Sequence, residues 1–234
     1  MVIDHIGFGI WYRLPEFGYL VPHTMDMETW WAIYLIMRNI GRTAFPIFCF
    51  LLVEGFFHTS SYYKYALRLF IFALLSQLPF HYAFLGLIGG LNIFFTLLIG
   101  LLAMWGMNEI KIRWPKHFTY LSIWVIIILG ACYVAYQLDT DYDYKGVLLI
   151  VVLFIFHKTR IIAMITSYFS FKAATYIGYS KMGFLKYLSM DYYFPGFILM
   201  CFYNGKRGLK IKYLFYLIYP AHLSMIYVAW KYLM

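Results

Sequence analysis

The chain of 234 residues is 64% hydrophobic and only 12% charged, and its mean hydropathy is +0.72. Soluble domains average about 45–50% apolar and about 25% charged residues, so this chain has too few charges to cover a soluble surface. The net charge of +9 would suggest nucleic acid as the partner of a soluble protein. Here we attribute it to basic cytoplasmic loops and expect membrane lipid, not nucleic acid, around the chain.

The apolar runs predict an all-α polytopic membrane protein, a bundle of about eight transmembrane helices that forms one integral membrane domain over residues 1–234. A bilayer-spanning helix needs about 20 residues. Two of the runs, which begin at Val147 and Tyr192, are short and need flanking residues to span. In chain order the runs are Trp30–Phe57, Ala66–Phe84, Leu91–Met107, Thr119–Leu138, Val147–Phe156, Ile161–Ile177, Tyr192–Tyr203 and Tyr213–Trp230.

A shorter apolar segment, Met1 to Tyr12, precedes these runs. As a helix of about a dozen residues it reaches only about 18 Å, short of the bilayer core of about 30 Å. We therefore expect the first transmembrane helix to be truncated, with residues upstream of Met1 completing it.

Charged residues in the loops alternate in sign along the chain. Residues 109–117 hold three basic residues against one acidic residue, whereas residues 139–145 hold three aspartates against one lysine. Cytoplasmic loops of membrane proteins are enriched in Lys and Arg. This rule predicts that loops 58–65, 109–117, 157–160 and 204–212 are cytoplasmic. It also predicts that loops 13–28, 85–90 and 139–145 and the loop in the 180s face outward.

Ionisable side chains at membrane depth mark functional sites by default, because they are costly to bury there. Asp4 and His5 lie in the first segment, and Arg38 and Arg42 share a helix face in the next one. We expect Asp4 to meet an arginine across a helix interface while His5 faces a cavity. The alternative is a buried ion pair that only fixes helix packing, with His5 merely hydrogen-bonded.

Four other residues carry weaker signals. Pro46 is expected to break the helix and free carbonyl groups near Arg42. Glu54 and His58 are four residues apart near the inner end of a span, which fits a structural pair as well as a functional one. His222 lies alone in the last apolar run, and such a histidine is more often packed and hydrogen-bonded than catalytic.

The stretch Tyr203-Asn-Gly-Lys-Arg-Gly is typical of a tight basic turn. Two glycines and an asparagine permit positive φ, and Lys206 and Arg207 could hold a phosphate group. An ordinary cytoplasmic loop explains the same residues equally well.

No metal site is predicted. The three cysteines lie in apolar runs and form neither a CxxC motif nor a Cys/His pair. They are expected to be buried, inert thiols.

Short motifs follow one another along the chain: Ile3-Asp4-His5-Ile6-Gly7, Gly41-Arg42-Thr43-Ala44-Phe45-Pro46-Ile47-Phe48, Glu54-Gly55-Phe56-Phe57-His58-Thr59, Tyr65-Ala66-Leu67-Arg68-Leu69, Pro79-Phe80, Asn92-Ile93-Phe94-Phe95-Thr96, Asp141-Tyr142 with Gly146, Tyr203-Asn204-Gly205-Lys206-Arg207-Gly208, and Tyr219-Pro220-Ala221-His222-Leu223. Their order and spacing resemble the TraX family of bacterial membrane proteins. The stretch from 42 to 58 is the most specific, and residues 160–195 match weakly.

That resemblance implies an acyltransferase of the bacterial cytoplasmic (inner) membrane that uses acetyl-CoA as donor. The acceptor would be a small peptide, such as a pilin-like peptide, or another amine. For this chemistry we expect His5 to act as general base, positioned by Asp4 with Arg42. Arg38, Arg42 or a backbone N–H near Pro46 is expected to stabilise the oxyanion. Arg68, Lys206 and Arg207 are expected to bind the phosphates of the donor.

Two other functions fit the same residues. A small-solute or peptide transporter would use the intramembrane charges as a proton relay, although transporters commonly contain internal repeats and none is found here. A non-catalytic membrane scaffold for a small peptide would need the charges only for packing. Acetyl-CoA-dependent modification of a peptide separates the enzyme from both.

Overall fold

The computed structural model describes residues 1–12, 26–84, 89–115, 117–178, 193–206 and 212–233. Throughout these ranges the regular structure is α-helical, which confirms the predicted all-α membrane fold. The helices are α1 (Val2–Gly9), α2 (Met27–Arg42), α3 (Ala44–His58), α4 (Tyr62–Ala83), α5 (Ile93–Arg113), α6 (His117–Gln137), α7 (Asp143–Ile155), α8 (Arg160–Gly178), α10 (Phe194–Cys201) and α11 (Lys212–Leu233).

Four helical stretches in the described part of the chain are long and apolar enough to cross a membrane. They correspond to the predicted runs that begin at Trp30, Ala66, Leu91 and Thr119. The two runs expected to be short differ from one another: α7 extends to 13 residues by beginning at Asp143, whereas α10 has eight. The four stretches are Met27–His58, which combines α2 and α3, Tyr62–Ala83, Ile93–Arg113 and Thr119–Gln137.

Large apolar side chains cover the outer surface of the bundle. Leu75 and Leu78 of α4 are 59% and 65% exposed, and Ile126 and Leu129 of α6 are 68% and 65% exposed. Contiguous apolar surface of this kind indicates contact with lipid or another apolar partner. The outward-facing residues of these helices therefore fit a bilayer.

The helix that runs from Met27 to His58 is interrupted at Thr43, as the position of Pro46 predicts. A proline ring clashes with the carbonyl group four residues earlier, here that of Arg42, and it cannot donate a backbone hydrogen bond. Gly196 of α10 packs directly against the Thr43 carbonyl, where a Cβ atom would collide. The break thus gives α10 a place to approach the backbone.

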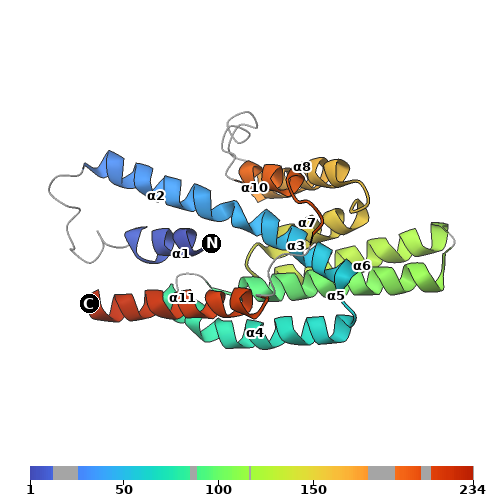
Figure 1. Cartoon of the computed structure of the whole chain (residues 1–234), viewed down its shortest axis with the longest axis horizontal. Coiled ribbons are helices and arrows are strands. Elements are labelled where there is room, and N and C mark those ends of the chain that lie inside the picture. Colours follow the sequence, from blue (N-terminus) through green and yellow to red (C-terminus); the bar gives the residue numbers. More distant parts are fainter. Residues whose placement is uncertain (13–25, 85–88, 116, 179–192, 207–211, 234) are drawn as a thin grey trace.

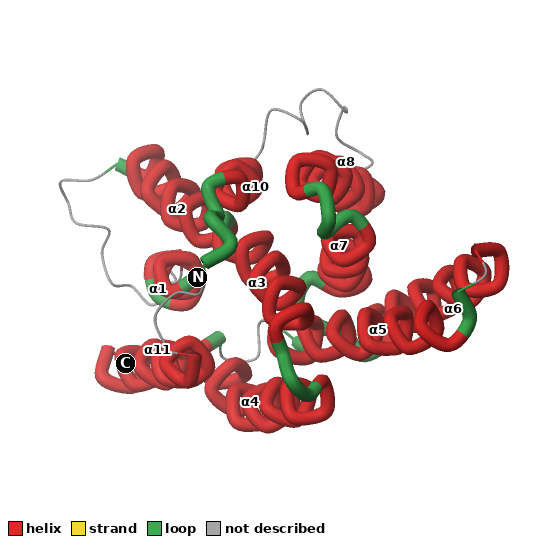
Figure 2. The backbone as a smooth tube through the Cα atoms, turned by 45° about the vertical axis from the view of Figure 1, so that its right-hand side comes forward, coloured by secondary structure: helices red, strands yellow, loops and turns green. Residues whose placement is uncertain are grey.

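The short helix α1 is held between α2 and α11 (Figures 1 and 2). The indole N–H of Trp230 in α11 donates a hydrogen bond to the Gly9 carbonyl. On the other side the Trp11 indole stacks on that of Trp30, with ring centroids 4.1 Å apart, and donates to the Trp30 carbonyl at 3.2 Å. These contacts fix both the depth and the rotation of α1, and therefore the positions of Asp4 and His5.

The loop between α6 and α7 is pinned to the start of α5. The Leu91 N–H donates to the Asp139 carbonyl at 3.0 Å, and the Asp141 N–H donates to the Leu91 carbonyl at 2.8 Å. Gly90 makes this approach possible, because it has φ +82° and a Cβ atom there would collide with the Asp139 carbonyl. Asp141 is thereby held beside the first turn of α5.

Gln77 and Asn92 form hydrogen bonds at the start of α5, next to this loop. The Asn92 Oδ1 atom accepts from the Phe94 N–H at 3.0 Å and caps α5, while its Nδ2 group donates to the Ala73 carbonyl at 2.8 Å. The Gln77 side chain accepts from the Asn92 backbone N–H at 3.0 Å. These residues lock the N-terminus of α5 against α4.

In Figure 1 the turns that join α3 to α4, α5 to α6 and α7 to α8 lie toward the side of the molecule opposite α1. These turns hold the basic loops 58–65, 109–117 and 157–160. Their common side is what the predicted cytoplasmic placement requires.

Candidate active site

A cavity of about 180 Å³ lies where α1, α2, α3, α4, α5 and α11 meet the loop between α6 and α7. Asp4, His5, Arg38 and Arg42 all line it. The structure therefore brings together the residues that the sequence indicates as candidates for catalysis, from the successive helices α1 and α2.

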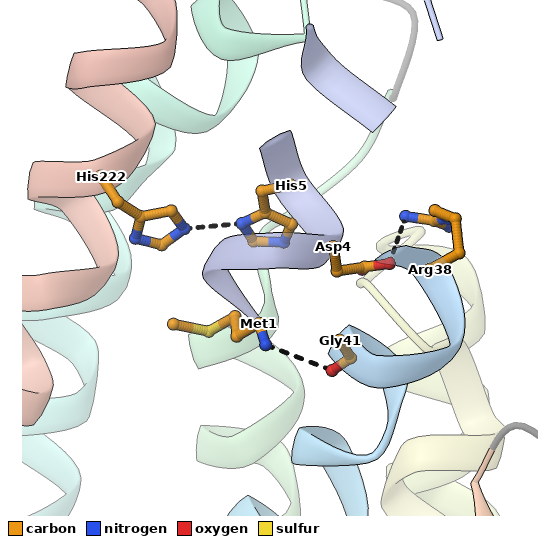
Figure 3. A network of polar contacts seen from close by, with 6 residues as sticks. All are labelled: Met1, Asp4, His5, Arg38, Gly41 and His222. Carbon is orange, nitrogen blue, oxygen red and sulfur yellow. Dashed lines mark hydrogen bonds and ion pairs between the residues drawn. The ribbon is translucent and has the colours of Figure 1, made fainter. Parts of the chain in front are cut away.

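Asp4 forms an ion pair with Arg38, with 2.8 Å between Oδ1 and Nη1 (Figure 3). The two side chains are only 12% and 19% exposed. Arg42, one helical turn after Arg38, lines the same cavity. Gly41 allows this arrangement, because a Cβ atom at this position would lie 2.7 Å from both the backbone nitrogen and Cα of Asp4.

His5 is hydrogen-bonded to His222 of α11, with 2.7 Å between its Nδ1 and the Nε2 of His222 (Figure 3). The other nitrogen of His222, Nδ1, lies 2.6 Å from the Ile218 carbonyl. A carbonyl oxygen only accepts, so Nδ1 of His222 carries a proton. In neutral His222 the Nε2 atom is then an acceptor, and His5 must donate from Nδ1.

This chain of hydrogen bonds leaves Nε2 of neutral His5 with its lone pair available. Apolar rings surround the imidazole: Phe84 and Tyr219 present their rings edge to face, with centroids 5.4 and 5.8 Å away. An oriented neutral imidazole is what a general base requires. His222, expected from sequence to be a packed residue, thus has a specific partner that sequence reasoning did not assign to it.

Asp141 and Tyr142 also line the cavity, although the sequence analysis placed them in an outward-facing acidic loop and gave them no role in the site. Burial raises the pKa of Asp141 to about 6, and the nearby Asp4 adds to the rise. Tyr142 has φ +65°, an unusual backbone conformation for a bulky residue, and it stacks on Phe45 with centroids 3.6 Å apart. The motif Asp141-Tyr142 with Gly146 could have pointed to these residues, but it does not indicate that they lie at the wall of a cavity.

Replacing Asp141 with Asn should make stability less dependent on pH. The folded protein holds the Asp141 proton up to about pH 6, above the ordinary pKa of 3.8. The stability that this carboxyl group contributes is therefore complete below about pH 4 and is lost as the pH rises through about 6. Relative to wild type, Asp141→Asn should gain about 1–3 kcal/mol between pH 4 and pH 7.5. Thermal unfolding across this pH range measures the gain.

Asp139→Asn is the matched control, because Asp139 lies exposed in the same loop. Its melting temperature should follow that of wild type across the pH range. Parallel curves for wild type and Asp141→Asn would contradict the burial of an acidic group in the cavity.

A second, mostly apolar cavity of about 240 Å³ adjoins the first. Phe48, Ile93 and Tyr219 line both cavities. Leucine side chains, including Leu69 and Leu97, form much of the remaining wall. The two cavities therefore form a polar compartment and an apolar compartment that meet at Tyr219.

Glu54 and His58 lie apart from these cavities, near the end of α3. The His58 ring donates from Nδ1 to the Glu54 backbone carbonyl at 2.8 Å. The Glu54 carboxyl group interacts with the Tyr203 hydroxyl and lines a separate cavity of about 90 Å³. Of the two interpretations that the sequence allows for this pair, these contacts favour the structural one.

The cations expected to bind a donor lie on different elements. Arg68 of α4 packs over the Tyr65 ring at 5.5 Å and interacts with the Tyr216 hydroxyl, next to the apolar cavity that both tyrosines line. Lys206 belongs to the turn after α10, where Gly205 has φ +73° as expected, and its N–H donates to the Asn204 side chain at 2.9 Å. Arg207 lies outside the described residues.

Comparison with known proteins places the chain in a family. A family model described as "TraX protein" matches residues 1–229. The chain is also 27% identical over 211 residues to a protein of Dichelobacter nodosus named "Probable fimbrial assembly protein FimC, serogroup H1", a match that covers 82% of each. No solved structure matches the chain. The match to nearly the whole chain, in agreement with the order of the sequence motifs, shows that the protein belongs to the TraX family.

Proposed function

We propose that this protein is a membrane-bound acyltransferase that transfers the acetyl group of acetyl-CoA to the amine of a peptide or another acceptor at the membrane. The observation that carries the proposal is the His5–His222 pair. It holds a neutral imidazole at the wall of a polar cavity with Nε2 available to take a proton.

The reaction needs such a base. An α-amino group has a pKa of about 8, so at neutral pH much of it is protonated and unreactive. In the proposed step the amine nitrogen attacks the thioester carbonyl carbon, and His5 Nε2 takes the proton that the nitrogen loses. The tetrahedral intermediate then expels the thiolate, which recovers the proton from the imidazolium.

The ion pair between Asp4 and Arg38 has a positioning role in this proposal. It joins α1 to α2 directly beside His5. Arg42 adds a second guanidinium group to the cavity wall. Asp4 therefore keeps His5 in place through its ion pair with Arg38, beside the guanidinium group of Arg42.

The donor is proposed to bind through the cations named above. Arg68 lies at the α4 side of the apolar cavity, and Lys206 lies in a turn whose positive charge suits a phosphate. Arg207 follows Lys206 directly in the sequence. In this arrangement the phosphates of acetyl-CoA contact basic side chains on the predicted cytoplasmic side of the protein.

The acceptor is proposed to be a small membrane peptide. The Dichelobacter nodosus relative is named as a probable fimbrial assembly protein, which supports a role in the assembly of a surface filament and a pilin-like subunit as partner. Such a subunit passes through the bacterial cytoplasmic membrane, where we place this protein with lipid around its apolar surface.

Co-expression with a small membrane peptide tests the proposal. Mass spectrometry of the peptide should show one added acetyl group at its N-terminus when the wild-type protein is present, and none with His5→Ala. A peptide that accumulates outside the cell without added mass would instead indicate transport. A peptide that is merely protected from degradation, again without added mass, would indicate a scaffold.

A further inference from the structure

Tyr219 of α11 has an unusual environment. The residue is 1% exposed, and its hydroxyl group is buried without a hydrogen-bond partner among the described residues. Most buried polar groups in proteins are hydrogen-bonded, and each exception calls for a specific explanation. The residue also lies where two cavities meet, because Tyr219 lines both the polar and the apolar one.

The surroundings of Tyr219 connect it to the histidine pair. Its ring centroid lies 5.8 Å from that of His5 and 5.5 Å from that of His222. His222 follows it by three residues on α11, so the two side chains extend from the same face of the helix. Any group that reacts near His5 is therefore close to Tyr219.

The Tyr219 oxygen also faces the first turn of α5. The backbone N–H of Ile93 lies next to it, and Ile93 is the first residue of a 21-residue helix. The first N–H groups of a helix have no partner inside the helix, and the helix dipole makes this end positive. A positive end next to the phenol oxygen polarises the O–H bond and makes the hydroxyl group a stronger donor.

From this geometry we propose that Tyr219 is a catalytic residue whose hydroxyl group donates a hydrogen bond to the carbonyl oxygen of the acyl group during transfer. The inference rests on the proposed acyl transfer. An acyl group has an apolar end and a reactive carbonyl carbon. At the junction of the cavities its apolar end would enter the apolar compartment, while its carbonyl group would face Tyr219 and His5.

The proposed step assigns separate roles to the two residues. As the amine nitrogen bonds to the carbonyl carbon, the π electron pair moves to the carbonyl oxygen, and His5 Nε2 takes the amine proton. The Tyr219 proton stays on the phenol and only strengthens its hydrogen bond as negative charge develops. When the carbon–sulfur bond breaks, the electron pair returns to the carbonyl group, and the thiolate leaves with the proton from His5.

Tyr219 adds a candidate to the groups that the sequence indicates for this role, which are Arg38, Arg42 and a backbone N–H near Pro46. Arg38 is engaged by Asp4. The backbone group near Pro46 that α10 contacts is the Thr43 carbonyl, which accepts hydrogen bonds and cannot donate one. The Tyr219 hydroxyl group, in contrast, has an unused donor at the junction where the carbonyl group would lie.

Tyr219→Phe tests the inference with a single-atom change. Loss of one donor to an oxyanion typically lowers kcat by about 10²–10³-fold, and we expect a loss of this size with little change in the KM for acetyl-CoA. Because the hydroxyl group has no acceptor for its proton in the described structure and only lies beside the Ile93 N–H, the variant should melt close to the wild-type temperature. Tyr227→Phe, two turns further along α11, is the control and should match wild type in kcat.

The outcomes separate this inference from the proposed function. Active wild type with a slow but fully stable Tyr219→Phe variant would support both. Active wild type with kcat within a few-fold in Tyr219→Phe would overturn the role of Tyr219 alone. A lower melting temperature with unchanged kcat would show a structural hydroxyl group instead. Absence of any acyl transfer by the wild type would overturn both proposals.

Discussion

His5→Ala should lower the rate of acyl transfer by about 10²–10⁴-fold, the usual contribution of a general base. The variant removes the nitrogen that takes the amine proton but leaves the ion pair of Asp4 with Arg38 in place. Expression and the melting temperature in detergent should therefore change far less than the rate. Measured kcat with acetyl-CoA and an amine peptide, together with thermal unfolding of the same preparation, tests both parts.

Two histidine variants define the role more closely. His222→Ala should cause a smaller loss, because His5 remains but its Nδ1 proton loses the acceptor that fixes the tautomer. His81→Ala, at an exposed position of α4, is the control and should retain the wild-type rate. If His5→Ala keeps activity within a few-fold while His58→Ala or His222→Ala loses it, His5 is not the base, and Asp4 with its arginine is a packing pair.

Gly41→Ala should abolish most activity without altering any group that takes part in chemistry. A Cβ atom at this position would lie 2.7 Å from the Asp4 backbone nitrogen and Cα, so α1 must move away from α2. A displacement of about 1 Å at a catalytic residue can cost about 100-fold in rate. The overpacked contact should also lower the free energy of unfolding by about 1–3 kcal/mol. Activity assays and thermal unfolding measure the two effects.

Gly130→Ala is the matched control for this substitution. It lies within α6, where a Cβ atom would meet nothing within 4 Å. Alanine is favoured over glycine in a helix by about 1 kcal/mol, so this variant should be at least as stable as wild type and fully active. Wild-type activity in Gly41→Ala would contradict the close docking of α1 on which the position of His5 depends.

The helical membrane fold could be predicted from the sequence because lipid imposes simple rules on length and composition. Continuous apolar runs located α4, α5 and α6 closely, and Pro46 located the break between α2 and α3. The α10 segment was located to within two residues at each end, because the predicted run is Tyr192–Tyr203 and the helix is Phe194–Cys201. Composition alone does not distinguish a spanning helix from a short apolar helix packed against the Thr43 break.

The candidate site was predictable only where a residue is unusual for its surroundings. Four ionisable residues lie in apolar segments, where burial costs free energy, and they therefore indicate a site. These residues are Asp4, His5, Arg38 and Arg42. The remaining parts of the site gave a weaker signal or none. His222 stands out in the sequence only as a lone histidine in an apolar run, and its partner is known only once α11 packs against α1. Tyr219 resembles the other tyrosines of an aromatic-rich chain. Their roles depend on contacts between segments more than two hundred residues apart in sequence.

The most direct test of the account uses the purified protein reconstituted in lipid vesicles, with acetyl-CoA that carries an isotopic label in the acetyl group. An amine peptide is added, and mass spectrometry follows the label. The account predicts that wild type moves the labelled acetyl group to the peptide amine and releases one CoA thiol for each peptide modified, and that His5→Ala does so at least about 100 times more slowly. A properly folded wild-type protein that leaves the peptide unlabelled, or His5→Ala that labels it at the wild-type rate, would contradict the account.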